Sequence, residues 1–159
     1  MTPDIFVQMA IKAWDIQVGR ATKFFNGLTD EDLLKEIAPG KNTALYLMGH
    51  LIAVNDNMIN LFGLGERLYS SFDELFVKSP DKSGQQFPVP SILRDDWGKS
   101  NEILSNYFAA MPANDWFGRH NAMTDEDLAK DPGRNKLSVL INRTNHVAYH
   151  LGQLILLNK

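Results

Sequence analysis

The stretch TALYLMGHLIAVNDNMINLFG, residues 43–63, decides the fold because it is long, apolar and free of proline. A proline–glycine break precedes it, with Asn42 or Thr43 as the N-cap, and we predict a helix that runs to about Phe62. Its large apolar side chains recur at helical spacing and form one stripe: Leu47, Leu51, Val54, Met58 and Leu61. His50 borders this stripe, so the helix should carry one histidine at the edge of a core.

The last stretch, TNHVAYHLGQLILLNK at residues 144–159, belongs to a helix predicted from about Lys136 to Leu157. Its core side is marked by Leu140, Val147, Leu151 and Leu154. His146 and His150 are four residues apart, which puts them roughly 40° apart around the helix axis, at the border of the core side.

Two further long helices are predicted. The first runs from Pro3 to about Asn26, with Thr2 as its N-cap. Its apolar residues at helical spacing are Ile5, Met9, Ala13 and Ile16. The other starts with Ser91 as N-cap and reaches about Met111. The sequence TDEDL occurs at residues 29–33 and 124–128, and each threonine is the expected cap of a short helix.

Four long amphipathic segments without a strand pattern predict an all-α protein, a four-helix bundle that forms a single domain over residues 1–159. The chain from Gly63 to Pro90 reads as irregular and is long for a connection inside a compact domain. We interpret it as a crossover that joins the second and third long helices, which would then not be simple antiparallel neighbours.

Composition narrows the function. The chain has 159 residues, a formal net charge of −3 and scattered Lys and Arg, which argues against a nucleic-acid partner. No apolar run reaches the ~20 residues of a membrane span, and the N-terminus lacks a signal-peptide pattern, so we expect a cytoplasmic protein without a membrane partner. Cysteine is absent, so a transition metal would need histidine, carboxylate or water as ligands.

The histidine pair of the last helix and His50 of the second helix can converge in the groove of a bundle. Three imidazoles with open coordination positions are a catalytic metal arrangement, because water or substrate takes the remaining positions. The spacing is also compatible with plain neighbours on a helix face. The pair is not a zincin motif, because Val147 stands where H-E-x-x-H has its glutamate.

The quoted stretches resemble a known family. TNHVAYHLGQLILL resembles the last-helix signature of the DinB/YfiT-like superfamily, in which H-x-x-x-H is followed by a small residue or arginine and then Gly-Gln. TALYLMGHLIAVNDNMINLFG resembles that family's second helix with its histidine. The resemblance implies a four-helix bundle with unusual linkage, often dimeric, in which His50, His146 and His150 bind nickel, zinc or iron(II). It also implies either a thiol S-transferase or a hydrolase.

Three functions remain open. A thiol S-transferase would use the cation to activate a small thiol cosubstrate. A hydrolase would use water activated by the cation and would need a carboxylate as proton shuttle, which neither histidine face offers. The third is a non-catalytic metal-binding or dimeric protein of a stress response.

Further residues have possible roles in the site. Arg143, about one turn before His146, could pair with a carboxylate of the cosubstrate, or could be an ordinary surface arginine. Asn57 and Gln153 could hydrogen-bond the histidines and fix their tautomers. His120 reads as a loop residue without a role.

A homodimer is also expected. Apolar residues of the last helix that point away from its core side need covering: Ile141, Leu156 and Leu157. The family resemblance points the same way.

Overall fold

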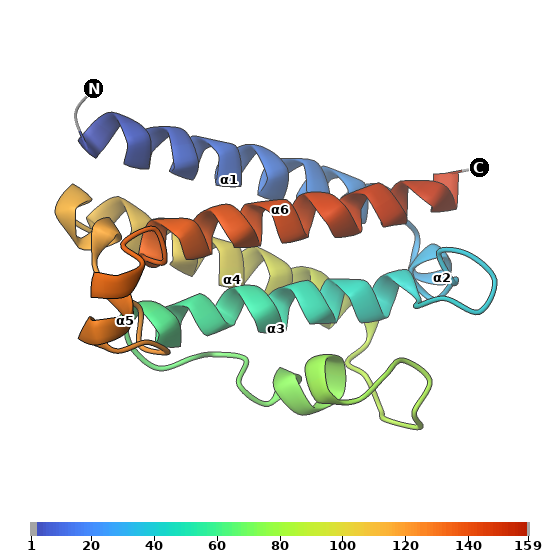
Figure 1. The fold of residues 1–159 in the computed structure, drawn as a ribbon. Coiled ribbons are helices and arrows are strands. Elements are labelled where there is room, and N and C mark those ends of the chain that lie inside the picture. The colour runs from blue at the N-terminus through green and yellow to red at the C-terminus, as the bar shows by residue number, and fades with distance from the viewer. Residues whose placement is uncertain (1–2, 159) are drawn as a thin grey trace.

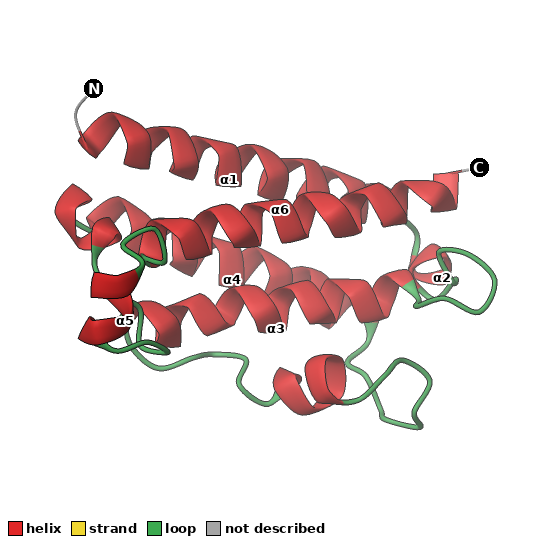
Figure 2. Cartoon of the chain, in the orientation of Figure 1, coloured by secondary structure: helices red, strands yellow, loops and turns green. Residues whose placement is uncertain are grey.

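The computed structural model describes residues 3–158, so the predicted cap Thr2 lies outside them. The four long helices are α1 (Pro3–Gly27), α3 (Ala44–Phe62), α4 (Pro90–Ala110) and α6 (Lys136–Leu154). The short elements are α2 (Asp30–Leu33), the π-helical turn η1 (Glu74–Lys78), the 3-10 turn η2 (Ala113–Phe117), α5 (Asp125–Lys130) and the 3-10 turn η3 (Ile155–Asn158). No strand occurs in residues 3–158 (Figure 2), which confirms the all-α prediction.

The long helices pack side by side, with α1 and α3 each in contact with both α4 and α6. In Figure 1, α3 and α4 both run from the right of the view to the left. Because these two neighbours are parallel, residues 63–89 must return along the length of the helices before α4 can begin. We call this segment the strap.

Local caps set the helix ends. Thr43 accepts a hydrogen bond from the Tyr46 amide at the start of α3, and Gly63 ends that helix with a φ of 70°. Thr29 and Thr124 both form capping boxes, so both TDEDL predictions are confirmed. The prediction that Ser91 is the N-cap of α4 is wrong, because Val89 holds that position. Pro90 takes the first helical position of α4, where its fixed φ suits a helix and its missing N–H costs nothing.

The predicted core face of α1 is also wrong. Ile5, Met9 and Ile16 are 43%, 61% and 44% exposed, and Ala13 is exposed as well. The buried positions are Val7, Trp14, Ala21 and Phe25. Trp14 packs edge-on against Phe108 of α4, and Phe25 packs edge-on against Trp97. These large rings bury more apolar surface than the aliphatic face would, so they decide which side of α1 turns inward.

The strap is irregular, as predicted, apart from the turn η1, and it packs closely on α3. Phe76 of η1 is fully buried, and its ring fills the space beside Gly49 that a side chain would occupy. The ring also stacks on Phe87 and packs against Tyr46. These ring contacts fix the middle of the strap on α3, and Figure 1 shows the strap running alongside that helix.

Polar bonds fix the rest of the strap. The fully buried Asp56 accepts hydrogen bonds from the Leu68 and Tyr69 amides at 3.0 and 3.1 Å, and from Arg67 at 2.9 Å. Farther along, the Tyr46 hydroxyl donates to the Ser79 carbonyl at 2.8 Å. The Asp81 carboxylate accepts from the Thr43 amide at 2.7 Å. The strap therefore lies antiparallel along α3 from its last turns to its first residue.

Candidate metal centre

Three imidazoles meet between α3 and α6. The Nε2 atom of His146 lies 3.3 Å from Nε2 of His50 and 2.9 Å from Nε2 of His150. One ring nitrogen from each residue lies within 4.8 Å of the others. The structure thus brings together the three histidines that the sequence singles out. They are a group able to hold a metal ion.

The opposite ring nitrogens of two of these histidines are held by oxygen atoms. Nδ1 of His50 lies 2.8 Å from the carbonyl oxygen of Phe76, and Nδ1 of His150 lies 2.7 Å from Oε1 of Gln153. A carbonyl oxygen only accepts hydrogen bonds, so each Nδ1 must carry the proton and donate it. In the neutral ring, Nε2 is then the atom with the free lone pair.

Gln153 is itself oriented. Its amide nitrogen donates a hydrogen bond to the Tyr149 hydroxyl at 3.3 Å, which turns Oε1 toward His150. Tyr149 is largely exposed, and its ring packs edge-on against the His150 ring. Tyr149 and Gln153 together therefore fix the plane and the tautomer of His150.

The three rings are kept neutral. Burial lowers the pKa of His50, against an opposing contribution from the Phe76 bond, and the charge of Arg143 lowers it further. Burial, then the neighbouring histidines and Arg143, lowers the pKa of His146 to about 4. Burial also lowers the pKa of His150, although its bond to Gln153 opposes the shift. Near neutral pH all three are imidazoles, the form that binds metal.

The donor set fits a divalent cation better than it fits hydrogen bonding alone. His50 and His150 both direct a lone pair at Nε2 of His146, whose single N–H is the one donor available for two acceptors. Nδ1 of His146 is buried and forms no hydrogen bond within residues 3–158. A cation accepts all three lone pairs at once and removes the repulsion between them.

The other predicted residues fall in different places. Asn57 makes no hydrogen bond to the three histidines in the described part of the chain, and Nδ1 of His50 is held by the Phe76 carbonyl instead. Arg143 is half-buried, and burial lowers its pKa, so it is not an ordinary surface arginine. His120 lies in a turn, where its Nδ1 accepts from the Ala122 amide. Sequence reasoning missed Phe76, whose contribution is a backbone carbonyl that every residue type provides.

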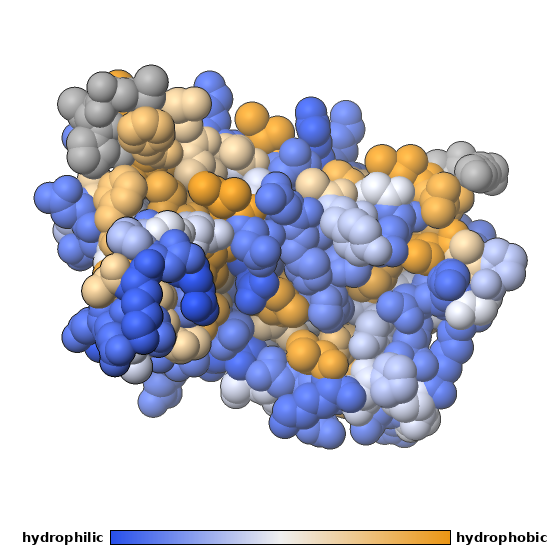
Figure 3. Space-filling model, in the orientation of Figure 1, coloured by the Kyte–Doolittle hydropathy of each residue, from blue (hydrophilic) through white to orange (hydrophobic). Residues whose placement is uncertain are grey.

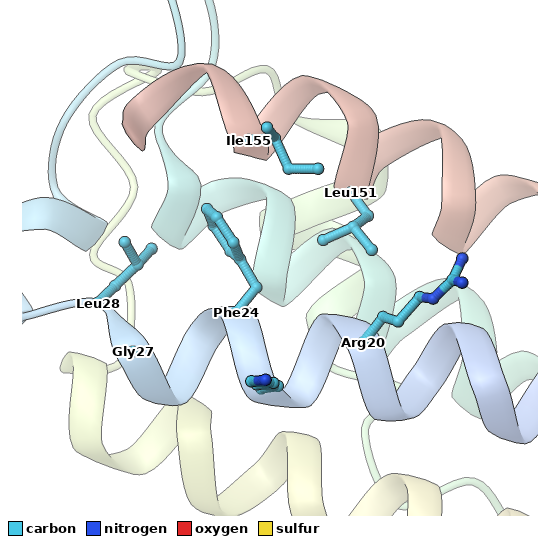
Figure 4. A pocket seen from close by; sticks show the side chains of 7 residues that line it. Arg20, Phe24, Gly27, Leu28, Leu151 and Ile155 are labelled. Atoms are coloured by element: carbon cyan, nitrogen blue, oxygen red, sulfur yellow. The ribbon is translucent and has the colours of Figure 1, made fainter. Parts of the chain in front are cut away.

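A larger hollow than the one near Arg143 lies on another side of α6. It has a volume of ≈ 530 Å³ and lies between α1 and α6 (Figure 4). Its lining is mostly apolar: Arg20, Lys23, Phe24, Gly27, Leu28, Leu151 and Ile155. None of the three histidines borders it, and it lacks converging polar groups, so we place the chemistry at the histidines instead.

The fold and the site define a class: an all-α protein with three converging imidazoles on two of its long helices. The chain belongs to the DinB superfamily, whose family model matches residues 13–154, which confirms the resemblance. No curated protein matches the chain. Within residues 3–158, no helix is both long enough and apolar enough to cross a membrane.

Proposed function

We propose that the protein is a metal-dependent enzyme in which His50, His146 and His150 hold nickel, zinc or iron(II), and that it transfers a small thiol to an electrophile. The observation that carries the proposal is the convergence of three Nε2 atoms, two of them on rings whose Nδ1 atoms are held by oxygen. Membership of the DinB superfamily supports it.

A divalent cation at this site would lower the pKa of a thiol and so supply a thiolate near neutral pH. The Phe76 carbonyl and the Gln153 amide hold two of the rings in the orientation that binding needs. In the overall reaction a carbon–sulfur bond forms, the bond from that carbon to its leaving group breaks, and the thiol proton passes to solvent.

Thiol transfer is favoured over hydrolysis by the surroundings of the histidines. Hydrolysis by an activated water needs a positioned general base. Within residues 3–158, no carboxylate hydrogen-bonds to any of the three imidazoles. Asp56 and Asp73 in the neighbouring structure are both bound to Arg67. A thiol needs no such base once its pKa is lowered.

The test uses protein purified without a histidine tag. We expect elemental analysis to find about one divalent ion per chain, as for a single three-histidine site. A chloronitrobenzene electrophile and a panel of small thiols should give transfer that a chelator abolishes and the metal restores. Bound metal without transfer of any thiol would favour a non-catalytic metal-binding protein of a stress response. A chain that binds no metal would overturn the proposal.

We also propose that the protein works as a homodimer through α1 and α6. Large exposed apolar residues gather on these two helices, which contact each other, and on η3 directly after α6: Ile5, Phe6, Met9, Ile16, Ile141, Tyr149, Ile155 and Leu156. Figure 3 shows apolar surface over α1 and toward the C-terminal end of α6. Surface of this kind favours a second copy of the chain as its cover.

A further inference from the structure

A small cavity lies one to two helical turns from the three histidines, none of which lines it. It has a volume of ≈ 200 Å³ and opens between α3, the strap and α6. Its lining residues are Ala53, Val54, Asn57, Asp73, Val77, Lys78 and Arg143. The α3 residues of this lining follow His50 by three to seven positions, and Arg143 precedes His146 by three. The cavity is therefore one to two helical turns from the imidazoles on both helices.

Arg143 is the one charged residue of this lining that forms no ion pair within residues 3–158. Asp73 binds Arg67, which it shares with Asp56, and the two terminal nitrogens of Arg67 donate to the Asp73 carboxylate at 2.6 and 2.7 Å. Lys78 pairs with Glu74 at 3.3 Å on the exposed side of η1. Arg143 has no carboxylate partner among the described residues. Within the described part of the chain, the only side-chain hydrogen bond of Arg143 goes to the Asn142 amide oxygen at 3.1 Å. The guanidinium of Arg143 thus lines the cavity without a direct partner of opposite charge within residues 3–158.

The position of Arg143 makes this charge costly. Its Nε is buried and has no hydrogen-bond partner within residues 3–158. A guanidinium stays protonated even when burial lowers its pKa, so the charge persists in the half-buried position. A buried donor without a partner costs free energy that a suitable acceptor recovers.

We propose that this cavity binds a carboxylate of the substrate and that Arg143 is the residue that recognises it. The planar guanidinium matches a carboxylate with two parallel hydrogen bonds, and Asn57 of α3, which also lines the cavity, offers an amide donor. Ala53, Val54 and Val77 enclose a few methylene groups between the carboxylate and the reacting sulfur. The assignment to a thiol rests on the proposed function, and it narrows the substrate to short thiols that carry a carboxylate.

The test compares two probes of the same shape, 3-mercaptopropionate and its neutral amide, by calorimetric titration of the metal-loaded protein. The wild type should prefer the carboxylate by about 10- to 100-fold, as expected for a charge-assisted pair. In Arg143→Met this preference should disappear while the amide binds unchanged, and Arg143→Lys should restore part of it. Arg119→Met is the matched control, because Arg119 pairs with Asp125 outside the cavity.

The outcomes separate this inference from the proposed function. An unchanged preference in Arg143→Met, or an equal loss in Arg119→Met, would overturn the cavity as the carboxylate site. Equal binding of both probes by the wild type would also overturn it. If the carboxylate binds through Arg143 but no thiol is transferred, the carboxylate site stands and the transferase proposal fails. Propionate, which lacks sulfur, should then compete with 3-mercaptopropionate in the wild type and not in Arg143→Met.

Discussion

At the scale of single residues, the site depends on which nitrogen of each imidazole carries the proton. The carbonyl of Phe76 and the amide of Gln153 decide this for His50 and His150. The sequence predicts the pair on α6, because helix geometry fixes residues four apart. It does not predict the Phe76 bond, which joins residues 26 positions apart through a backbone atom.

We expect His50→Ala and His146→Ala each to weaken metal binding by on the order of 100-fold or more, because each removes one of three ligands. Changes to residues that only hydrogen-bond a ligand already weaken metal binding by about 10- to 100-fold. Both residues are at the edge of the core, so the helical circular dichroism signal should persist. The measurement is a competition titration with a chromogenic chelator. His120→Ala is the control, and wild-type affinity in both site variants would place the metal elsewhere.

The depressed pKa of His146 predicts how the metal-free protein responds to acid. Between its folded value of about 4 and its ordinary value of 6.5, the unfolded chain binds a proton that the folded chain excludes. Stability is therefore fully present above 6.5 and falls as the pH is lowered through this window, by at most about 1.4 kcal/mol per pH unit for one proton. Urea unfolding of chelator-treated His146→Gln should show a shallower pH dependence than wild type, and an identical slope would contradict the assignment.

At the scale of elements, signals within a few residues were readable from the sequence, and so was the core side of α6, whereas the core face of α1 was not. The capping threonines at residues 29, 43 and 124 act on amides three positions away, so the sequence alone reveals them. On α1, two faces are apolar, and packing against α4 and α6 decides that Trp14 turns inward and Met9 outward. The path of the strap is set by contacts with α3 between residues that are distant in sequence.

Gly49→Ala should loosen the strap, because the added Cβ would overlap the buried Phe76 ring. We expect a loss of about 1–3 kcal/mol in the free energy of unfolding, typical of overpacking. Metal affinity should fall as well, since displacement of Phe76 weakens the bond that holds His50.

Gly98→Ala in α4 is the matched control for this change, because its Cβ would meet no atom within 4 Å. Alanine there should stabilise the helix by about 0.5–1 kcal/mol. Chemical denaturation and metal titration of the two variants measure both effects. Unchanged metal affinity in a destabilised Gly49→Ala would separate the strap from the site.

At the scale of the whole molecule, the all-α class followed from the sequence because amphipathic periodicity is a property of each segment. The parallel arrangement of α3 and α4 (Figure 1) depends on which helices pair, and pairing is a property of the complete set of faces. The apolar residues that remain on α1 and α6 belong to this scale too.

The dimer proposal predicts a mass in solution of twice the 17.9 kDa of one chain, measured by light scattering at about 10 μM. Ile16→Glu and Ile141→Glu should shift the protein toward single chains, because each would bury a charge in the interface. Leu68→Glu, at an exposed apolar residue of the strap, is the control and should leave the mass unchanged. A wild type with the mass of one chain would contradict the proposal.

The hydrogen bonds between the strap and α3 are nested in sequence, so that each residue pair encloses the previous one. The residue pairs 56–68, 50–76, 46–79 and 43–81 are 12, 26, 33 and 38 positions apart. Each inner pair closes the shorter loop and so shortens the free chain for the next, which makes closure from the Asp56 end the route of lowest entropy cost.

Fraying should run in the reverse direction, from Asp81 inward. By hydrogen exchange, the Thr43 amide should open well before the Tyr69 amide. A cation bound to His50 would stabilise the second of these pairs, 50–76. Exchange of the Tyr69 amide should then slow, while exchange near Asp81 stays unchanged. If the Tyr69 amide of the metal-free protein exchanged as fast as the Thr43 amide, or faster, the proposed order of opening would be wrong. The hydrogen-exchange rate of the strap would then report whether metal is bound, although the strap contributes no side-chain ligand.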